Sequence, residues 1–125
     1  MIAADTSSLV EFFSGGSGND VSSIADAMKA RVLFLSPPVL SEILSDPEIP
    51  EALEKVITQF PILETRVGFW QRAGKTRALV LAQGKKVRLG DALIAQFCLD
   101  HDIALITRYA DFSRFEKVAH LKVIW

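Results

Sequence analysis

Four acidic residues of the 125-residue chain lie beside short apolar segments, where a carboxylate needs a specific partner. Asp5, Glu42 and Asp111 each follow such a segment, and Asp91 opens one. Carboxylates that gather within about 4–6 Å of one another raise each other's pKa unless a cation neutralises their charge. A few carboxylates with retained waters suit the hard cations Mg²⁺ and Mn²⁺. If the fold brings the four acids together, they predict a site for one of these ions.

Each acid taken alone also has an ordinary structural interpretation. Asp5 could cap a helix, Glu42 could border a buried helix face, and Asp111 could belong to a turn. Asp91 could interact with the dipole of the helix that it opens, which would keep the carboxylate ionised. An acid in the first turn of a helix usually accompanies a Ser, Thr, Asp or Asn cap, and residues 87–90 contain none. The helix start therefore explains Asp91 only in part. The metal hypothesis therefore depends on all four acids being neighbours.

The chain has too few histidines and cysteines for a zinc site or an internal disulfide. His101 and His120 are the only histidines, and Cys98 is the only cysteine. No pair of them has zinc-ligand spacing, and a single cysteine forms no internal disulfide. Because Cys98 lies inside an apolar run, we expect it to be a small buried hydrophobe.

Short, continuously apolar runs predict the strands of the fold. They occupy residues 2–4, 32–35, 104–106 and 121–125, with a further short strand at 61–63. The segments between them predict helices at 6–13, 21–28, 37–44, 48–59, 66–83 (capped by Thr65), 89–100 and 111–117. Apolar strands that alternate with helices indicate a parallel sheet covered on both faces. The sequence predicts one domain, residues 1–125, with a three-layer α/β/α sandwich around a mainly parallel sheet.

This architecture indicates where the chemistry should lie. Ligands of open parallel sheets bind beyond the carboxyl ends of the strands. Asp5, Glu42 and Asp111 all come after strands, so we expect them to project from that edge. Asp91 instead opens the helix that leads into the strand at 104–106, and its placement depends on how that helix packs.

The net charge of −1 conceals a segregation of charge along the chain. Seven of the fourteen basic residues lie from Arg66 to Arg88, and no acid lies between Glu64 and Asp91. Such a segment can form a basic surface on a nearly neutral protein. A metal site beside a basic surface favours a polyanionic substrate with phosphate oxygens. A plain solvated helix face is the alternative.

The basic segment is expected to place its charges unequally. Arg72 and Lys75 project away from the predicted apolar arc and are candidates for contact with the phosphates of such a substrate, or for solvation alone. Arg77 falls within that arc and should pair with an acid or extend its charge to the surface. The predicted arc consists of Val67, Trp70, Val80 and Leu81. We expect Trp70, Phe69 and Phe97 to be core or dimer contacts rather than platforms on which bases stack.

The composition is that of a globular protein, with 50% hydrophobic and 23% charged residues. No apolar run approaches the roughly 18 residues of a membrane span, and no basic segment leads into an apolar one at the N-terminus. We therefore expect a soluble, cytoplasmic protein without a membrane partner.

Four segments, in this order, resemble the PIN domain, and in particular the small ribonuclease toxins of the VapC type. They are residues 2–7 (IAADTS), 36–44 with Glu42, 89–95 (LGDALIA) and 104–112 (ALITRYADF). The resemblance covers nearly the whole chain. It implies a metal-dependent endoribonuclease that acts on RNA, forms a homodimer and is inhibited by a small antitoxin protein.

The resemblance also implies roles for individual residues. Asp5, Glu42 and Asp91 would hold one or two Mg²⁺ or Mn²⁺ ions, and Asp111 would complete the set. The hydroxyls of Thr6, Ser7 and Thr107 would orient a carboxylate or the scissile phosphate, or would serve only as helix caps. Arg108 is the basic residue expected nearest the scissile phosphate.

One position departs from the family pattern. The family commonly has an acid or Asn two residues after the threonine, where this chain has Tyr109, and often a second Asp before the phenylalanine. Asp111 could take over the ligand role, or the site could work with three acids. A second hypothesis follows, in which the chain is an inactive PIN-like module that binds RNA or a partner protein.

Two other acid-and-magnesium families fit less well. A phosphatase of the haloacid dehalogenase type needs a second Asp two residues after the first, where this chain has Ser7. A receiver-like phosphoacceptor domain needs a lysine after a later strand, where Ile106 is followed by Thr107 and Arg108.

Overall fold

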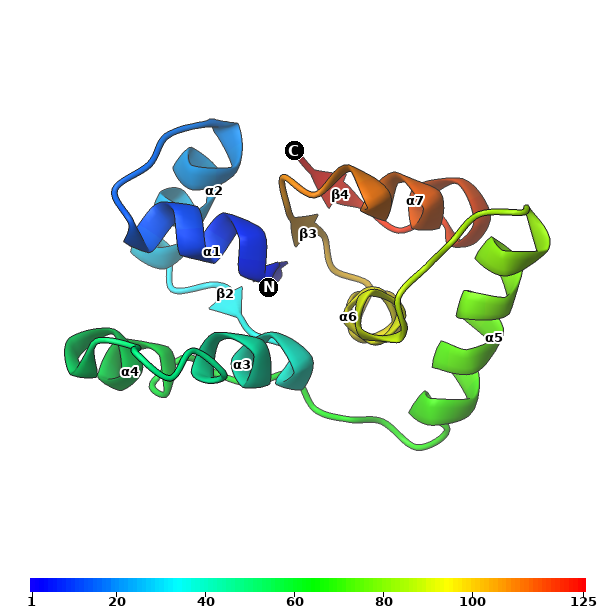
Figure 1. The fold of residues 1–125 in the computed structure, drawn as a ribbon, viewed down its shortest axis with the longest axis horizontal. Helices are drawn as coiled ribbons and strands as arrows, with labels where there is room; N and C mark the ends of the chain where they lie inside the picture. Colours follow the sequence, from blue (N-terminus) through cyan, green and yellow to red (C-terminus); the bar gives the residue numbers. More distant parts are fainter.

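The computed structural model describes residues 1–125 and contains a central four-stranded sheet (Figure 1). The strands are β1 (Ile2–Ala4), β2 (Leu33–Phe34), β3 (Leu105–Ile106) and β4 (Val123–Ile124). They lie in the order β2-β1-β3-β4, and all neighbouring pairs are parallel. Ala3 lies opposite Phe34 on one side and Leu105 on the other. The predicted strands and their parallel arrangement are confirmed, although each strand is short.

Seven α-helices and one 3₁₀ turn surround the sheet. They are α1 (Thr6–Phe13), α2 (Asn19–Lys29), α3 (Pro37–Leu44), α4 (Glu51–Ile57), α5 (Phe69–Ala82), α6 (Leu89–His101), η1 (Ala110–Phe112) and α7 (Ser113–Ala119). Figure 1 shows α6 nearly end-on at the centre of the molecule, with α3 on one side and α5 on the other. The predicted α/β/α architecture is confirmed.

A single cluster of 25 buried apolar residues forms the core. Strands β1 and β3 contribute side chains with almost no exposed surface, as does the middle of α6. Cys98 belongs to this cluster, and burial raises the pKa of its thiol to about 12. Its predicted role as a small buried hydrophobe is confirmed. None of the helices is long and apolar enough to span a bilayer.

The structure corrects the predicted start and buried face of α5. The helix begins at Phe69, and not after Thr65, because Gly68 adopts a left-handed conformation with φ of 81° that interrupts the helix. The predicted arc was also wrong, since Val67 is 98% exposed and Trp70 is 66% exposed. The buried face consists of Phe69, Ala73, Thr76 and Val80.

Three smaller segments differ from their predicted lengths. The predicted strand at 61–63 forms only an isolated bridge, between Leu35 and Ile62. The helix predicted at 48–59 is shorter, as α4. The turn of helix predicted at 111–117 divides into η1 and α7. None of these changes alters the sheet edge at which the acids were expected.

Candidate active site

Asp5 lies at the carboxyl end of the central strand β1. Its backbone N–H donates to the carbonyl of Ile106 (2.8 Å), which continues the pairing with β3. Asp5 occupies the N-cap position of α1, but its side chain makes no capping hydrogen bond. The carboxylate is only 5% exposed, and its Oδ2 accepts hydrogen bonds from Ser7 Oγ (2.9 Å) and Thr107 Oγ1 (3.0 Å). The capping interpretation of Asp5 was therefore wrong.

Thr107 links the ends of β1 and β3. Its fully buried hydroxyl donates to Asp5 and accepts the backbone N–H of Tyr109 (3.0 Å). This arrangement fixes the orientation of the Asp5 carboxylate and the path of the chain after β3. The predicted role of Ser7 and Thr107 in orienting a carboxylate agrees with these contacts.

Two buried hydroxyls at the same edge of the sheet have no hydrogen-bond partner. They are Thr6 Oγ1, which follows β1, and Ser36 Oγ, which follows β2. Buried polar groups are nearly always satisfied by protein or by ordered water. An unsatisfied hydroxyl beside Asp5 is therefore a group that a bound water or ligand can satisfy.

Asp91 shares its surroundings with the other three acids. Burial and the charges of Asp5, Glu42 and Asp111 together raise its pKa to about 6, although Arg88 acts in the opposite direction. Helix α6 begins without a side-chain cap, so Asp91 has no capping role. The pKa of Glu42 is raised by burial and by the charge of Asp5. The structure thus brings the predicted acids into one electrostatic neighbourhood.

The acids do not form a closed coordination sphere. No three His, Cys, Asp or Glu side chains are grouped closely enough to hold a metal ion directly. The donor set nevertheless fits a hydrated hard cation, because it consists of carboxylates and hydroxyls. The Oδ1 atom of Asp5 accepts no hydrogen bond. Thr6 Oγ1 makes no close hydrogen bond, although the Thr6 hydroxyl lies near enough to Glu42 to lower the pKa of that carboxyl. Raised pKa values are expected where like charges meet without a cation.

Asp111 is engaged by two other side chains, Tyr109 and Arg114. The Tyr109 hydroxyl donates to its Oδ2 (2.8 Å), and Arg114 Nη2 lies 3.5 Å from its Oδ1. Tyr109, at the position where the family commonly has an acid or Asn, therefore holds Asp111. The pKa of Tyr109 is raised by this hydrogen bond.

The structure corrects the expected placement of Arg108. Its Nε donates to Asp20 Oδ2 (2.7 Å), and its Nη1 lies 3.4 Å from Glu11 Oε2. Asp20 is buried and also accepts Ser8 Oγ (2.7 Å). Arg108 holds the pKa of Asp20 at about 2, against the effect of burial. The guanidinium thus joins the segment after β3 to α1 and α2, and its predicted contact with the scissile phosphate is not retained.

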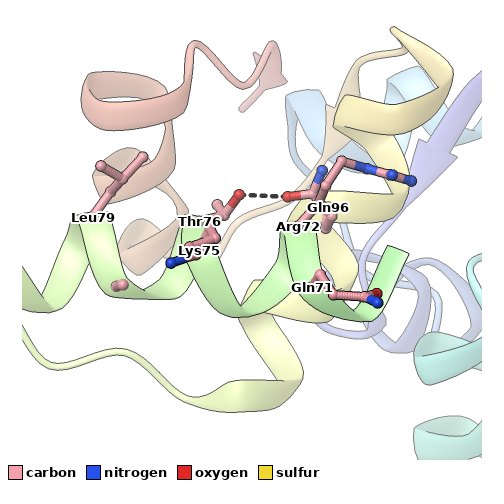
Figure 2. A pocket seen from close by; sticks show the side chains of 7 residues that line it. Gln71, Arg72, Lys75, Thr76, Leu79 and Gln96 are labelled. Atoms are coloured by element: carbon pink, nitrogen blue, oxygen red, sulfur yellow. Dashed lines mark hydrogen bonds between the residues drawn. The ribbon is translucent and has the colours of Figure 1, made fainter. Parts of the chain in front are cut away.

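The basic residues of α5 also differ from prediction. Arg72 pairs with Asp100 through Nε (2.9 Å) and Nη2 (2.6 Å). The Gln96 side chain accepts a hydrogen bond from Thr76 Oγ1 (Figure 2). It also donates to Asp100 (2.8 Å), which completes a network between α5 and α6. A guanidinium held by a carboxylate is a weak candidate for RNA binding.

Lys75 and Arg77 have different environments. Lys75 is exposed, has no ion pair and borders a shallow hollow on α5 (Figure 2). The predicted contact between Lys75 and a substrate phosphate stays a proposal. Arg77 donates to the backbone carbonyl of Val87 (3.2 Å), and not to an acid. The alternative of an ion pair for Arg77 was therefore wrong.

Sequence reasoning missed one residue beside the acids. Arg88 is the N-cap residue of α6, and its charge lowers the pKa of both Asp91 and Glu42. It is exposed and has no ion pair. The available signal was its position, three residues before Asp91 at the end of the basic segment.

Comparisons with known proteins agree with this geometry. Crystal structures with the same fold include VapBC2 from Rickettsia felis bound to a promoter DNA fragment (TM-score 0.78, 18% identity, 99% of this chain and 98% of that chain). A second is FitAcB from Neisseria gonorrhoeae (TM-score 0.72, 17% identity, 100% of this chain and 97% of that chain). A third is VapBC-5 from Mycobacterium tuberculosis (TM-score 0.71, 17% identity, 98% of this chain and 96% of that chain). At these identities the similarity establishes the fold. No curated protein matches the chain.

The profile of the PIN domain family matches residues 2–118. The match includes all four acids and the strands β1, β2 and β3. Since the profile spans nearly the whole chain and the sheet has the same architecture as in those crystal structures, the chain belongs to the PIN domain family.

Proposed function

We propose that this chain is a metal-dependent endoribonuclease and the toxin of a toxin–antitoxin pair. The observation that carries the proposal is the electrostatic coupling of Asp91 to Asp5, Glu42 and Asp111 at the carboxyl edge of the sheet. PIN domains are generally nucleases, which supports hydrolysis of a nucleic acid. RNA as the substrate rests on the resemblance to VapC-type toxins and on the basic segment.

Asp5, Glu42 and Asp91 would hold one or two Mg²⁺ or Mn²⁺ ions, and Asp111 would complete the set. A bound ion supplies a water of lowered pKa and stabilises charge on the phosphoryl oxygens. Ser7 and Thr107 orient the Asp5 carboxylate through its Oδ2 and leave Oδ1 free. The Thr6 hydroxyl, which lies near Glu42 without a close hydrogen bond, would contact a water or a phosphate oxygen. Arg88 places an unpaired positive charge beside the acids, where the substrate phosphate would lie.

The cognate partner would be a small antitoxin protein. The crystal structures of the VapBC and FitAB types are complexes, which supports such a partner. A groove of about 300 Å³ between α1, α3 and α4 borders Glu42 and is mostly apolar. An antitoxin segment lying in this groove would reach the acids and block them. We also propose that the toxin acts as a homodimer in the cytoplasm.

The direct test is RNA cleavage by four proteins in Mg²⁺ or Mn²⁺. Wild type is compared with Asp5→Asn, Asp91→Asn and the control Asp102→Asn. Asp102 ends α6 in an exposed, left-handed position that Asn also tolerates. Wild type and the control should cleave, and the two site variants should be at least 100-fold slower. Equal cleavage by all four proteins would contradict the proposal.

A second hypothesis, a PIN-like module without nuclease activity, is favoured by one observation. Tyr109 stands where the family commonly has an acid or Asn, and its hydroxyl donates a hydrogen bond to the Asp111 carboxylate. Metal-independent RNA or protein binding by wild type, with no cleavage in either metal, would establish this alternative.

A further inference from the structure

A small hollow lined by cations lies between α5 and α7, away from the acids that would hold the metal. Its volume is about 220 Å³. Its lining consists of Val80, Gln83, Lys85, Arg114, Lys117 and Val118. Three of these six residues are basic and none is acidic, so the hollow is suited to an anion.

The charges of this hollow are largely free. Lys85 and Lys117 are exposed and form no ion pair, and the Gln83 amide offers further N–H donors. By contrast, Arg66, just before α5, and Arg72, within it, are both engaged by other groups. Arg66 donates to the backbone carbonyl of Asp100, and Arg72 pairs with the carboxylate of Asp100. Apart from Lys75, the available charge of the basic segment is therefore concentrated at its C-terminal end.

Arg114 connects the hollow to the acidic site. One end of its guanidinium lies 3.5 Å from Asp111 Oδ1, and its Nη1 donates to the carbonyl of Lys86 in the loop between α5 and α6. The same loop leads to Arg88, which lies beside Asp91. In Figure 1 this loop passes from the end of α5, next to α7, to the start of α6. A row of positive charge thus runs from the hollow to the acids.

We infer that the hollow binds a backbone phosphate of the RNA substrate, at a nucleotide that flanks the cleaved bond. This inference rests on the proposed function. The cations of Lys85 and Lys117 hold the flanking phosphate, and Arg88 receives the strand as it enters the acidic site. Lys75, Arg72 and Arg108 lie outside this path. The same phosphate chemistry is offered by free nucleotides, so the experiment separates the two sources.

The test measures binding of a fluorescein-labelled single-stranded RNA by anisotropy in EDTA, at several salt concentrations. Without divalent metal the RNA is not cleaved, so binding is measured apart from activity. The variant Lys85→Gln/Lys117→Gln is compared with wild type and with Lys29→Gln/Lys55→Gln. The control pair removes the same charge from α2 and α4, outside the basic segment. Lys55 forms an exposed pair with Glu51 (3.4 Å), which contributes little to stability. All four lysines are exposed, so melting temperatures should be unchanged.

We expect the Lys85/Lys117 variant to bind about tenfold more weakly at low salt, with the control pair within about twofold of wild type. The negative slope of log K against log salt should become shallower by about 1.4, which corresponds to two lost phosphate contacts on a single strand. Equal slopes, equal losses in the two pairs, or no RNA binding by wild type would each overturn the inference.

A second measurement separates RNA from free nucleotides. Inorganic phosphate and a nucleoside 5′-monophosphate are titrated calorimetrically into wild type and the Lys85/Lys117 variant. We expect neither to bind wild type tightly, because one phosphate lacks the neighbouring contacts of a strand. Saturable micromolar binding that the variant loses would make a free nucleotide the occupant and overturn the RNA assignment. If wild type cleaves RNA but the Lys85/Lys117 variant has the same salt dependence of RNA binding as wild type, only this subsite is refuted. If the variant has a weaker salt dependence but wild type does not cleave RNA, only the nuclease proposal is refuted.

Discussion

The Asp91 carboxyl is held in an environment that opposes its ionisation. It lies in the first turn of α6, where the helix dipole favours a negative charge. Burial and three neighbouring acids outweigh this effect, since its pKa rises to about 6. At neutral pH the carboxylate is therefore ionised at a cost in stability, which a bound cation would remove. The dipole alone does not explain the residue, contrary to its simplest interpretation.

The substitution Asp91→Asn separates the chemical role from a structural one. If Asp91 acted only through the helix dipole, removal of its charge would lower stability by about 0.3–1 kcal/mol. Because Asp91 makes no capping bond, we expect Asp91→Asn to raise the stability of the metal-free protein at pH 7.5 by about 1 kcal/mol, allowing for solvent screening. Thermal denaturation checks this. A loss of stability together with unchanged cleavage would assign Asp91 to the fold.

The same group predicts a dependence on pH. The folded-state pKa of Asp91, about 6, is above its model value of 3.8, so the folded protein binds the proton more tightly. Its effect is absent below pH 4, grows between pH 4 and 6, and stays constant above. The melting temperature of Asp91→Asn minus that of wild type should increase over this range. A difference that is flat with pH would refute the shift, and added Mn²⁺ should reduce the difference at pH 7.5.

At the scale of elements, an ion-pair cluster holds α2 against the segment that follows β3. Asp20 lies at the start of α2 and is buried, and it accepts hydrogen bonds from Ser8 of α1 and from Arg108. Arg108 immediately follows Thr107, which contacts Asp5. The cluster therefore supports the loop that orients the central carboxylate, although it contributes no ligand to the site.

We expect Asp20→Ala to destabilise the fold by about 2 kcal/mol, because it leaves Ser8 and Arg108 without their acceptor. Urea denaturation measures the loss. Asp26→Ala on the same helix is the matched control, since Asp26 is exposed, and it should change stability by less than about 0.5 kcal/mol. Equal effects of the two substitutions would show that the Asp20 cluster does not hold α2.

A second network sets the orientation of α5. Thr76, Gln96, Asp100 and Arg72 form a chain of hydrogen bonds between α5 and α6. Apolar residues occur on every side of α5, so helical periodicity in the sequence did not identify its buried face. The partner helix selected that face by presenting Gln96 opposite Thr76.

At the scale of the whole molecule, the exposed side of α5 predicts the surface of the proposed homodimer. Trp70 is 66% exposed and stacks edge-to-face on the buried ring of Phe69 (5.0 Å between centroids). We expect Trp70→Glu to raise the dimer dissociation constant at least tenfold, because burying a carboxylate in an apolar interface is unfavourable. Light scattering after size exclusion measures the change. Val56→Glu, at an exposed apolar position of α4, should leave the dimer intact, and a monomeric wild type would contradict the prediction.

The sequence by itself was sufficient for the sheet and for the positions of the acids along it. Continuous apolar runs alternating with helices allow few arrangements other than a parallel sheet, and Asp5 ends its first strand. Strand ends are local features, so chemistry placed at strand ends can be recognised before the fold is known. Asp5 was singled out in this way, Glu42 as an acid in the helix that follows a strand, and Asp91 as an acid at a helix start without a cap.

Only the tertiary structure decided which side chains are free to act. Arg108 and Arg72 are basic, as expected, but the fold presents Asp20 to one and Asp100 to the other. Those acids are 88 and 28 residues away in the chain. Likewise, Tyr109 engages Asp111, and Arg88 stands beside Asp91. The physical reason is that charge pairing depends on distances of a few ångströms between segments far apart in sequence, which packing alone determines.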